Sequence, residues 1–171
     1  MPFATPDPRN PFSQLRFRRA AADLVVLTKP ELALLVRTAE TVWEEFGRSM
    51  SAPLITVPAA TGLRPGELYG LHWPDVDFAA CELQVLRQRQ SRTGEEVLPG
   101  GRVRRQRVVV LPGEAADALR RVPKHGADDH VFWTPGGEPF TTRTFGYYWR
   151  PIRAAFLVQL VRAGRRRSAS G

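Results

Sequence analysis

Residues 60–68 read ATGLRPGEL, and residues 71–78 continue as LHWPDVDF. Gly62 is typical of a helix stop, and the proline and glutamate that follow Arg64 are typical of the first turn of a new helix. Arg64 therefore lies at a predicted helix start, three residues ahead of Glu67 and before an apolar run. A guanidinium held in this way is well placed to bind an anionic oxygen, such as one of a phosphate group.

The alternative interpretation is that Arg64 merely pairs with Glu67 across one helical turn, a contact worth about 0.2–0.5 kcal/mol. Asp75 and Asp77 are interpreted as turn formers rather than as acid–base or metal-binding groups. His72 is interpreted as a packing or surface residue.

The charge of the 171-residue chain is one-sided. The formal net charge is +8, and only two of the 25 basic residues are lysines. Residues 1–85 carry 8 basic and 10 acidic side chains, a net charge of −2, whereas residues 86–171 carry 17 and 7, a net charge of +10. An arginine-rich excess of this kind favours phosphate partners, because the planar guanidinium binds phosphate oxygens in pairs. A membrane surface is disfavoured, because no basic amphipathic helix with an aromatic face is present.

Several classes of protein are excluded by composition. Cys81 is the single cysteine, so neither an intrachain disulfide nor a thiolate metal cluster is possible. The three histidines lack metal-ligand spacing, and no cofactor is expected. The proline-rich N-terminus is not a signal peptide, and no apolar run of 18 residues exists. A cytoplasmic protein is expected.

The first half of the chain predicts helices after an arm. Residues 1–27 are proline-rich and then basic. Residues 28–31, TKPE, fit a capping box, and apolar residues follow on one face as far as Phe46, before a stop at Gly47. A second apolar stretch covers residues 54–60, with a proline on either side of its first turn.

The second half predicts strands and then helices. Residues 82–89 alternate as one strand, 90–101 form a long hairpin loop, and 103–111 form a second strand. The remaining elements are a short helix at 113–122, a short strand at 131–133, a helix capped by Thr141 or Thr142 and interrupted at Pro151, and a charged tail at 164–171.

These segments resemble, in the same order, the catalytic domain of tyrosine recombinases (phage-type integrases). The Arg64 block is similar to the family's first arginine box. Residues 27–32, LTKPEL, are similar to its domain start, with Asn10-Pro11 as the preceding linker. Residues 131–141, VFWTPGGEPFT, are similar to the strand, turn and helix ahead of its second arginine box.

The resemblance covers roughly residues 28–155 and implies an α+β fold. We expect a mainly helical recombinase-type catalytic domain, represented by its N-terminal half, with a small antiparallel sheet of two or three strands. The expected organisation is an N-terminal arm or linker at 1–27, a partial catalytic domain at 28–163 and a basic tail at 164–171.

In that family a tyrosine attacks the scissile DNA phosphate and forms a 3′-phosphotyrosyl bond. The resemblance implies that Arg64 clamps the phosphate and that Glu67 orients Arg64. A hairpin lysine normally protonates the leaving oxygen, but Gly101 or Arg102 stands at that position here. An arginine is a poor proton donor because its pKa lies above about 12.

The family's second arginine box and its tyrosine are expected after residue 155, and neither follows. Tyr69, Tyr147 and Tyr148 all come too early in the order. The chain is thus expected to be a DNA-binding fragment that has lost strand cleavage and rejoining, through truncation or a frame shift. The alternatives are a non-catalytic DNA-binding or regulatory module, which competes with a full-length integrase, and a decayed remnant.

The candidate site combines two groups of residues. Arg64 and Glu67 are the candidate catalytic pair. The candidate contacts to double-stranded DNA are arginines of the hairpin and of the capped helix: Arg102, Arg104, Arg105, Arg107 and Arg143. A merely solvated face is the alternative for the hairpin arginines, although so many without an acidic partner on the second strand favour phosphate contact.

Overall fold

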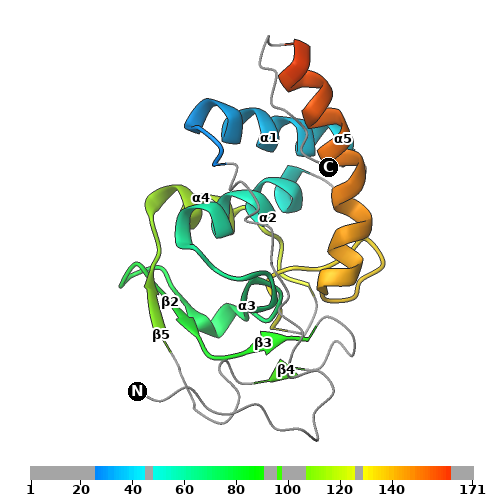
Figure 1. The fold of residues 1–171 in the computed structure, drawn as a ribbon. Coiled ribbons are helices and arrows are strands. Elements are labelled where there is room, and N and C mark those ends of the chain that lie inside the picture. The colour runs from blue at the N-terminus through cyan, green and yellow to red at the C-terminus, as the bar shows by residue number, and fades with distance from the viewer. Residues whose placement is uncertain (1–25, 45–47, 91–95, 98–106, 126–128, 163–171) are drawn as a thin grey trace, which may run out of the picture.

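The computed structural model describes residues 26–44, 48–90, 96–97, 107–125 and 129–162. Within these ranges, helices form one layer and short strands the other, with the arginine-block helix close to the strands (Figure 1). The helices are α1 (Lys29–Val42), α2 (Arg48–Thr61), α3 (Pro65–Tyr69), α4 (Gly113–Arg120) and α5 (Thr142–Arg162), with a 3-10 turn, η2, at Trp73–Asp75. The α+β, mainly helical architecture predicted from the sequence is confirmed.

Helix α1 begins where its capping box predicts. The Glu31 carboxylate accepts hydrogen bonds from the Thr28 backbone N–H at 2.8 Å and from the Thr28 hydroxyl at 2.7 Å. Leu35, Ala39 and Trp43 are buried on the predicted apolar face. The expected continuation to residue 46 and the stop at residue 47 lie outside the described residues, and α1 itself ends at Val42.

Helix α2 begins six residues before the predicted apolar stretch 54–60 and includes both prolines, Pro53 and Pro58. Each proline removes one backbone donor from the interior of the helix. The helix ends at Thr61 and is followed by Gly62, whose φ of +68° is the left-handed conformation that glycine adopts most easily. The predicted stop ahead of the arginine block is therefore confirmed.

Helix α5 begins at the predicted threonine cap but is not interrupted at Pro151, contrary to expectation. The Thr141 hydroxyl accepts the backbone N–H of Thr144 at 3.1 Å, so Thr141 is the capping residue. Pro151 is exposed and supplies no N–H to the turn before it. The carbonyl that loses its helical donor is that of Tyr147, four residues earlier. The adjacent Tyr148 carbonyl accepts the Trp43 indole N–H at 3.2 Å, which fastens this turn of α5 to the residue that follows α1.

The predicted sheet is present, with changes in its strands. Antiparallel strands β1 (Val76–Asp77), β2 (Glu82–Val85) and β5 (Arg107–Val110) lie in the order β1-β2-β5. The single strand predicted at 82–89 is wrong, because the chain leaves β2 and forms β3 (Gln88–Arg89), which pairs with β4 (Glu96–Val97) in a separate two-stranded sheet. The 74–77 turn contributes β1, and β4 lies within the predicted loop.

The predicted strand at 131–133 is also wrong. Two isolated bridges replace it: His130 pairs with His72, and Trp133 pairs with Pro139. Val131 and Phe132 are fully buried, which explains the apolar run that suggested a strand. The segment passes through the core without a neighbouring strand long enough to form a ladder.

The turn between β1 and β2 is tight. Asp77 accepts the backbone N–H groups of Ala79 and Ala80 at 2.9 and 2.8 Å, as the turn-former interpretation predicts. The exposed Cys81 completes the turn at a φ of +57°, a conformation that non-glycine residues adopt at some cost.

Two glycines bring α3 against β3. A Cβ atom at Gly66 would lie 3.1 Å from the Arg89 carbonyl oxygen. A Cβ atom at Gly70 would lie 3.1 Å from the Arg89 nitrogen and 3.3 Å from the Gln88 carbonyl carbon. Any larger residue at either position would have to displace the β3 backbone by a few tenths of an ångström, so the two glycines favour this close approach of the helix that follows Arg64.

We expect Gly70→Ala to lower the free energy of unfolding by about 1–3 kcal/mol, because its methyl group would push β3 away from α3. The matched control is Gly146→Ala in α5, where a Cβ atom meets nothing within 4 Å. That change should raise stability by roughly 1 kcal/mol through helix propensity. Chemical denaturation measures both, and a Gly70→Ala protein as stable as the parent would contradict the close-contact argument.

Candidate nucleic-acid interface

Arg64 immediately precedes α3, and its side chain reaches into solvent. The side chain is 79% exposed, and its Nη1 lies 3.7 Å from Oε1 of Glu67. The Arg64 backbone N–H donates to Oε2 of Glu67 at 2.9 Å. The backbone of Arg64 is thus anchored firmly, while its guanidinium is held only loosely by the acid.

Glu67 is the centre of the site. Its side chain has no exposed surface, and its carboxylate receives two hydrogen bonds from Arg107, at 2.6 and 2.8 Å. A fully buried carboxylate needs such partners, because burial of an unpaired charge is costly. Two guanidiniums and one carboxylate leave a formal charge of +1 in the cluster, and that charge lies nearest to solvent at Arg64.

Electrostatics keep Glu67 ionised. Burial alone would raise the pKa of Glu67, but the hydrogen bonds from Arg107 and from the Arg64 backbone, with the charges of both arginines, outweigh burial and lower the pKa below its ordinary value. The hydrogen bond to Glu67 in turn raises the pKa of Arg107. The cluster is therefore a fixed set of charges at neutral pH.

A second carboxylate repeats this arrangement nearby. Asp75 is buried, accepts the His72 backbone N–H at 3.1 Å and binds Arg87 at 2.7 and 3.4 Å. Arg87 precedes β3, and Arg107 begins β5, so the two pairs clamp the two ends of the basic hairpin segment. Sequence analysis missed both clamps, since it left the hairpin arginines without acidic partners.

The other predicted contacts are only partly described. Arg102, Arg104 and Arg105 lie outside the described residues. Arg107 lies at the site, but its guanidinium is hydrogen-bonded to both carboxylate oxygens of Glu67. Arg143 is exposed in the first turn of α5 and, with Arg150 and Tyr147, lines a cavity of about 490 Å³.

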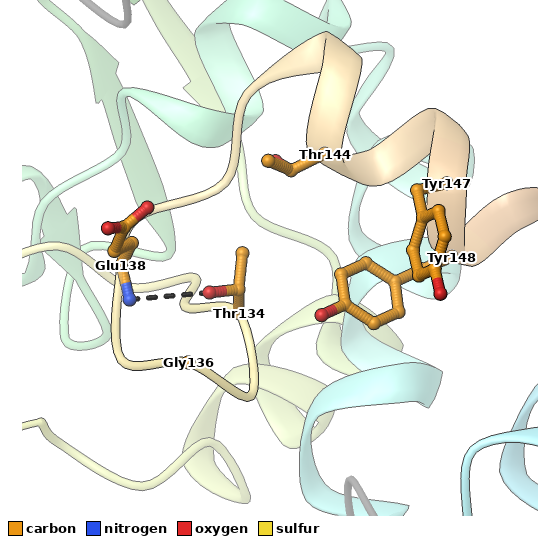
Figure 2. A pocket seen from close by; sticks show the side chains of 6 residues that line it. All are labelled: Thr134, Gly136, Glu138, Thr144, Tyr147 and Tyr148. Carbon is orange, nitrogen blue, oxygen red and sulfur yellow. Dashed lines mark hydrogen bonds between the residues drawn. The ribbon is translucent and has the colours of Figure 1, made fainter.

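A neighbouring cavity of about 370 Å³ lies between the start of α5 and the turn that precedes it (Figure 2). Thr134, Glu138 and Thr144 contribute polar groups to its wall, and the Glu138 N–H donates to the Thr134 hydroxyl at 3.3 Å. Tyr147 and Tyr148 lie at its rim, with their rings edge to face at 5.3 Å. The start of α5 thus offers polar and basic groups on a hollowed surface.

The three tyrosines of the sequence differ in their access to solvent. Tyr69 is 2% exposed, and burial raises the pKa of its hydroxyl. Tyr148 packs edge-on against Trp43, with ring centroids 5.5 Å apart. Tyr147 is 72% exposed on α5.

Other groups near the site have structural contacts. His72 packs against His130, with ring centroids 4.3 Å apart. Across the described part of the chain, no group of three or more histidine, cysteine, aspartate or glutamate side chains has a geometry that holds a metal ion. No helix in the same part is long and apolar enough to cross a membrane.

The sequence pattern of the phage integrase family matches residues 26–163. The chain belongs to this family. The match covers α1 through α5 and includes Arg64, Glu67 and Arg107, so the resemblance inferred from the sequence is confirmed. No curated protein matches this integrase-family chain.

Solved recombinases share its fold. The crystal structure of XerA recombinase is 23% identical with a TM-score of 0.56, over 80% of this chain and 44% of that one. A Tn1549 transposon integrase in complex with circular intermediate DNA is 22% identical with a TM-score of 0.58, over 83% and 56%. A second such complex is 19% identical with a TM-score of 0.62, over 92% and 61%. The present chain thus spans about half the length of these solved proteins.

The lowered pKa of Glu67 predicts a pH-dependent contribution to stability. A carboxylate whose pKa is lower when folded stabilises the fold above its ordinary pKa of 4.5, and this stabilisation is lost as pH falls through the lowered value. We expect Glu67→Gln to lower the free energy of unfolding at pH 7 by about 1–3 kcal/mol. The loss should lie near the lower end of this range, because solvent screens the partly exposed Arg107.

The difference in stability between the two proteins should narrow below about pH 4.5, where residue 67 of the unfolded parent takes up a proton while the folded parent, with its lowered pKa, does so only at a lower pH. Denaturant unfolding of both proteins at pH 7, 5 and 3.5 measures this difference in the free energy of unfolding. A gap that stays constant across this range would contradict an ionised, paired Glu67.

Proposed function

We propose that this integrase-family chain binds duplex DNA through its backbone phosphates, as part of a site-specific recombinase, and that Arg64 is the residue that grips a phosphate. The observation that carries the proposal is that Arg64 and Arg107 make different contacts with Glu67. The carboxylate accepts its short hydrogen bonds from Arg107 and from the Arg64 backbone N–H, so the Arg64 guanidinium remains exposed and charged.

This geometry argues against the simple pairing of Arg64 with Glu67. An arginine neutralised by its neighbour would lie within hydrogen-bond distance of it, whereas the Arg64 guanidinium lies at 3.7 Å. Because the backbone of Arg64 is anchored and its planar guanidinium is exposed, this side chain can donate two hydrogen bonds to two oxygens of one phosphate. The Tn1549 integrase complexes with DNA support the same partner.

Further phosphate contacts are proposed on both sides of Arg64. Arg102, Arg104 and Arg105 belong to the hairpin segment whose two ends are clamped by Asp75 and Glu67, and the C-terminal half of the sequence carries the positive excess. Arg143 would add a contact at the start of α5, where the surface is hollowed and the helix N-terminus also favours anions.

We further propose that the 171-residue chain does not cleave DNA unaided. The family's chemistry needs a tyrosine hydroxyl that reaches the phosphate and is activated there. Tyr69 is buried and Tyr148 is packed, which leaves Tyr147 as the exposed candidate. A chain that binds without cutting would compete with a full-length integrase for its sites.

Salt-dependent binding tests the role of Arg64. We expect Arg64→Ala to weaken binding to duplex DNA roughly tenfold to a hundredfold, the effect of losing charge-assisted hydrogen bonds. The slope of log affinity against log salt should fall by about 0.9, one phosphate contact. Fluorescence anisotropy between 50 and 300 mM salt measures both.

The matched control is Arg120→Ala. Arg120 is also exposed and also pairs with an acid three residues away, Asp117, but it lies on α4. Its removal should leave the slope near that of the parent. Parent binding that does not respond to salt would overturn the proposed DNA contact itself.

A nicked suicide substrate tests the proposed lack of cleavage. Incubation of the chain with radiolabelled nicked duplex should give no protein–DNA adduct that survives detergent, because Tyr69 is buried, Tyr148 is packed against Trp43 and all three tyrosines precede the place of the family's nucleophile in the order of its motifs. An adduct would refute the proposal, and its loss in Tyr147→Phe would identify the nucleophile.

A further inference from the structure

We propose that Arg107 is a positioning residue that holds Arg64 in place through Glu67, rather than a ligand of DNA phosphate. This inference rests on the proposed function of Arg64 and adds a residue, 43 positions further along the chain, that the function requires.

The first support is the geometry of the shared carboxylate. Oε2 of Glu67 accepts both the Arg64 backbone N–H, at 2.9 Å, and Nη2 of Arg107, at 2.8 Å. Oε1 accepts Nη1 of Arg107 at 2.6 Å and lies 3.7 Å from Nη1 of Arg64. Each oxygen of one buried carboxylate therefore faces both arginines, so the orientation that Arg107 imposes is transmitted to Arg64.

The second support is the cost of any other arrangement. If Arg107 turned toward a phosphate, it would leave a fully buried carboxylate without its two strongest hydrogen bonds, which is strongly unfavourable. Arg64 bears no such constraint, since its guanidinium makes no short bond to Glu67. The two arginines beside one acid therefore take different roles: one binds the acid, and the other is left for the anion.

The third support is the place of Arg107 in the fold. It is the first residue of β5 and pairs with Val85 of β2 across the sheet. Its backbone is thus fixed by the three-stranded sheet, whereas Glu67 belongs to a helix of five residues. A short helix has little stability of its own, so the bond from a strand residue ties the arginine-block helix to a rigid support.

The Asp75–Arg87 pair offers a matched comparison within the same chain. It has the same chemistry, a buried carboxylate that accepts a backbone N–H and binds an arginine at 2.7 Å. Its backbone partner, however, is His72 rather than Arg64. Removal of Arg87 should therefore affect stability in the same way as removal of Arg107 but leave the phosphate contact of Arg64 intact.

A double-mutant cycle separates positioning from direct contact. The proteins are the parent, Arg64→Ala, Arg107→Gln and the double variant, with Arg87→Gln as control, and the probe is a duplex DNA oligonucleotide titrated across salt concentrations. We expect Arg107→Gln to weaken binding roughly tenfold, and the double variant to bind as Arg64→Ala does, with a salt slope lower than that of the parent by about 0.9.

Additive losses in the double variant, with a slope lower by about twice that amount, would overturn the inference, because they mean that Arg107 touches its own phosphate. Equal losses in Arg107→Gln and Arg87→Gln would also overturn it, since they indicate general destabilisation. If Arg107→Gln does not fold, Arg107→Lys, which keeps the charge but loses the planar fork, takes its place in the cycle.

A second readout needs no DNA. The backbone amide resonance of Arg64 should respond to the ionisation of Glu67, since the two groups are hydrogen-bonded. We expect its pH midpoint to lie below 4.5 in the parent, to rise in Arg107→Gln and to stay unchanged in Arg87→Gln. An unchanged midpoint in Arg107→Gln would overturn the coupling, whereas salt-independent DNA binding by the parent would overturn the proposed function alone.

Discussion

A single buried carboxylate organises the functional half of this molecule. Glu67 has no contact with water, yet it stays ionised because three donors from two parts of the chain converge on it. One of these donors is the backbone of the residue that the site presents to solvent. These hydrogen bonds offset the cost of the buried charge and fix the Glu67 carboxylate in place. The fixed carboxylate in turn positions Arg64, whose guanidinium is exposed.

The packing around α3 serves the same end. Gly66 and Gly70 let the helix lie against the backbone of β3, and Asp75, in the 3-10 turn η2 that follows, forms a second acid–arginine pair. Neither contact adds chemistry of its own. Together they leave the short helix few ways to move, which suits the proposed contact with a rigid, highly charged polymer.

Local features were predictable from the sequence, and long-range ones were not. The caps at Thr28 and Thr141 and the stop at Gly62 depend on residues within three or four positions, so the sequence pattern predicts them correctly. The turn of α5 that precedes Pro151 is fastened by Trp43, more than 100 residues away, which donates to the Tyr148 carbonyl, and no local pattern predicts such a contact. The 131–133 segment was misread as a strand because its burial, rather than strand pairing, explains its apolar residues.

In the candidate site, too, the local features were predictable from the sequence and the long-range ones were not. Arg64 and Glu67 share one helical turn and were identified from their spacing and from the family resemblance. The partner of Glu67 lies 40 residues away, and no spacing rule connects the two positions. The arginines of the hairpin segment look equivalent in the sequence, and only the folded chain shows that Arg87 and Arg107 already have acidic partners.

The turn between β1 and β2 has a practical consequence. Cys81 is exposed there and is the only thiol in the sequence. A maleimide fluorophore would therefore attach at one defined position without any engineered substitution. Because Cys81 adjoins the sheet that contains Arg107, energy transfer from it to a labelled duplex end would report the direction in which a bound duplex crosses the protein, if the proposed DNA contact forms.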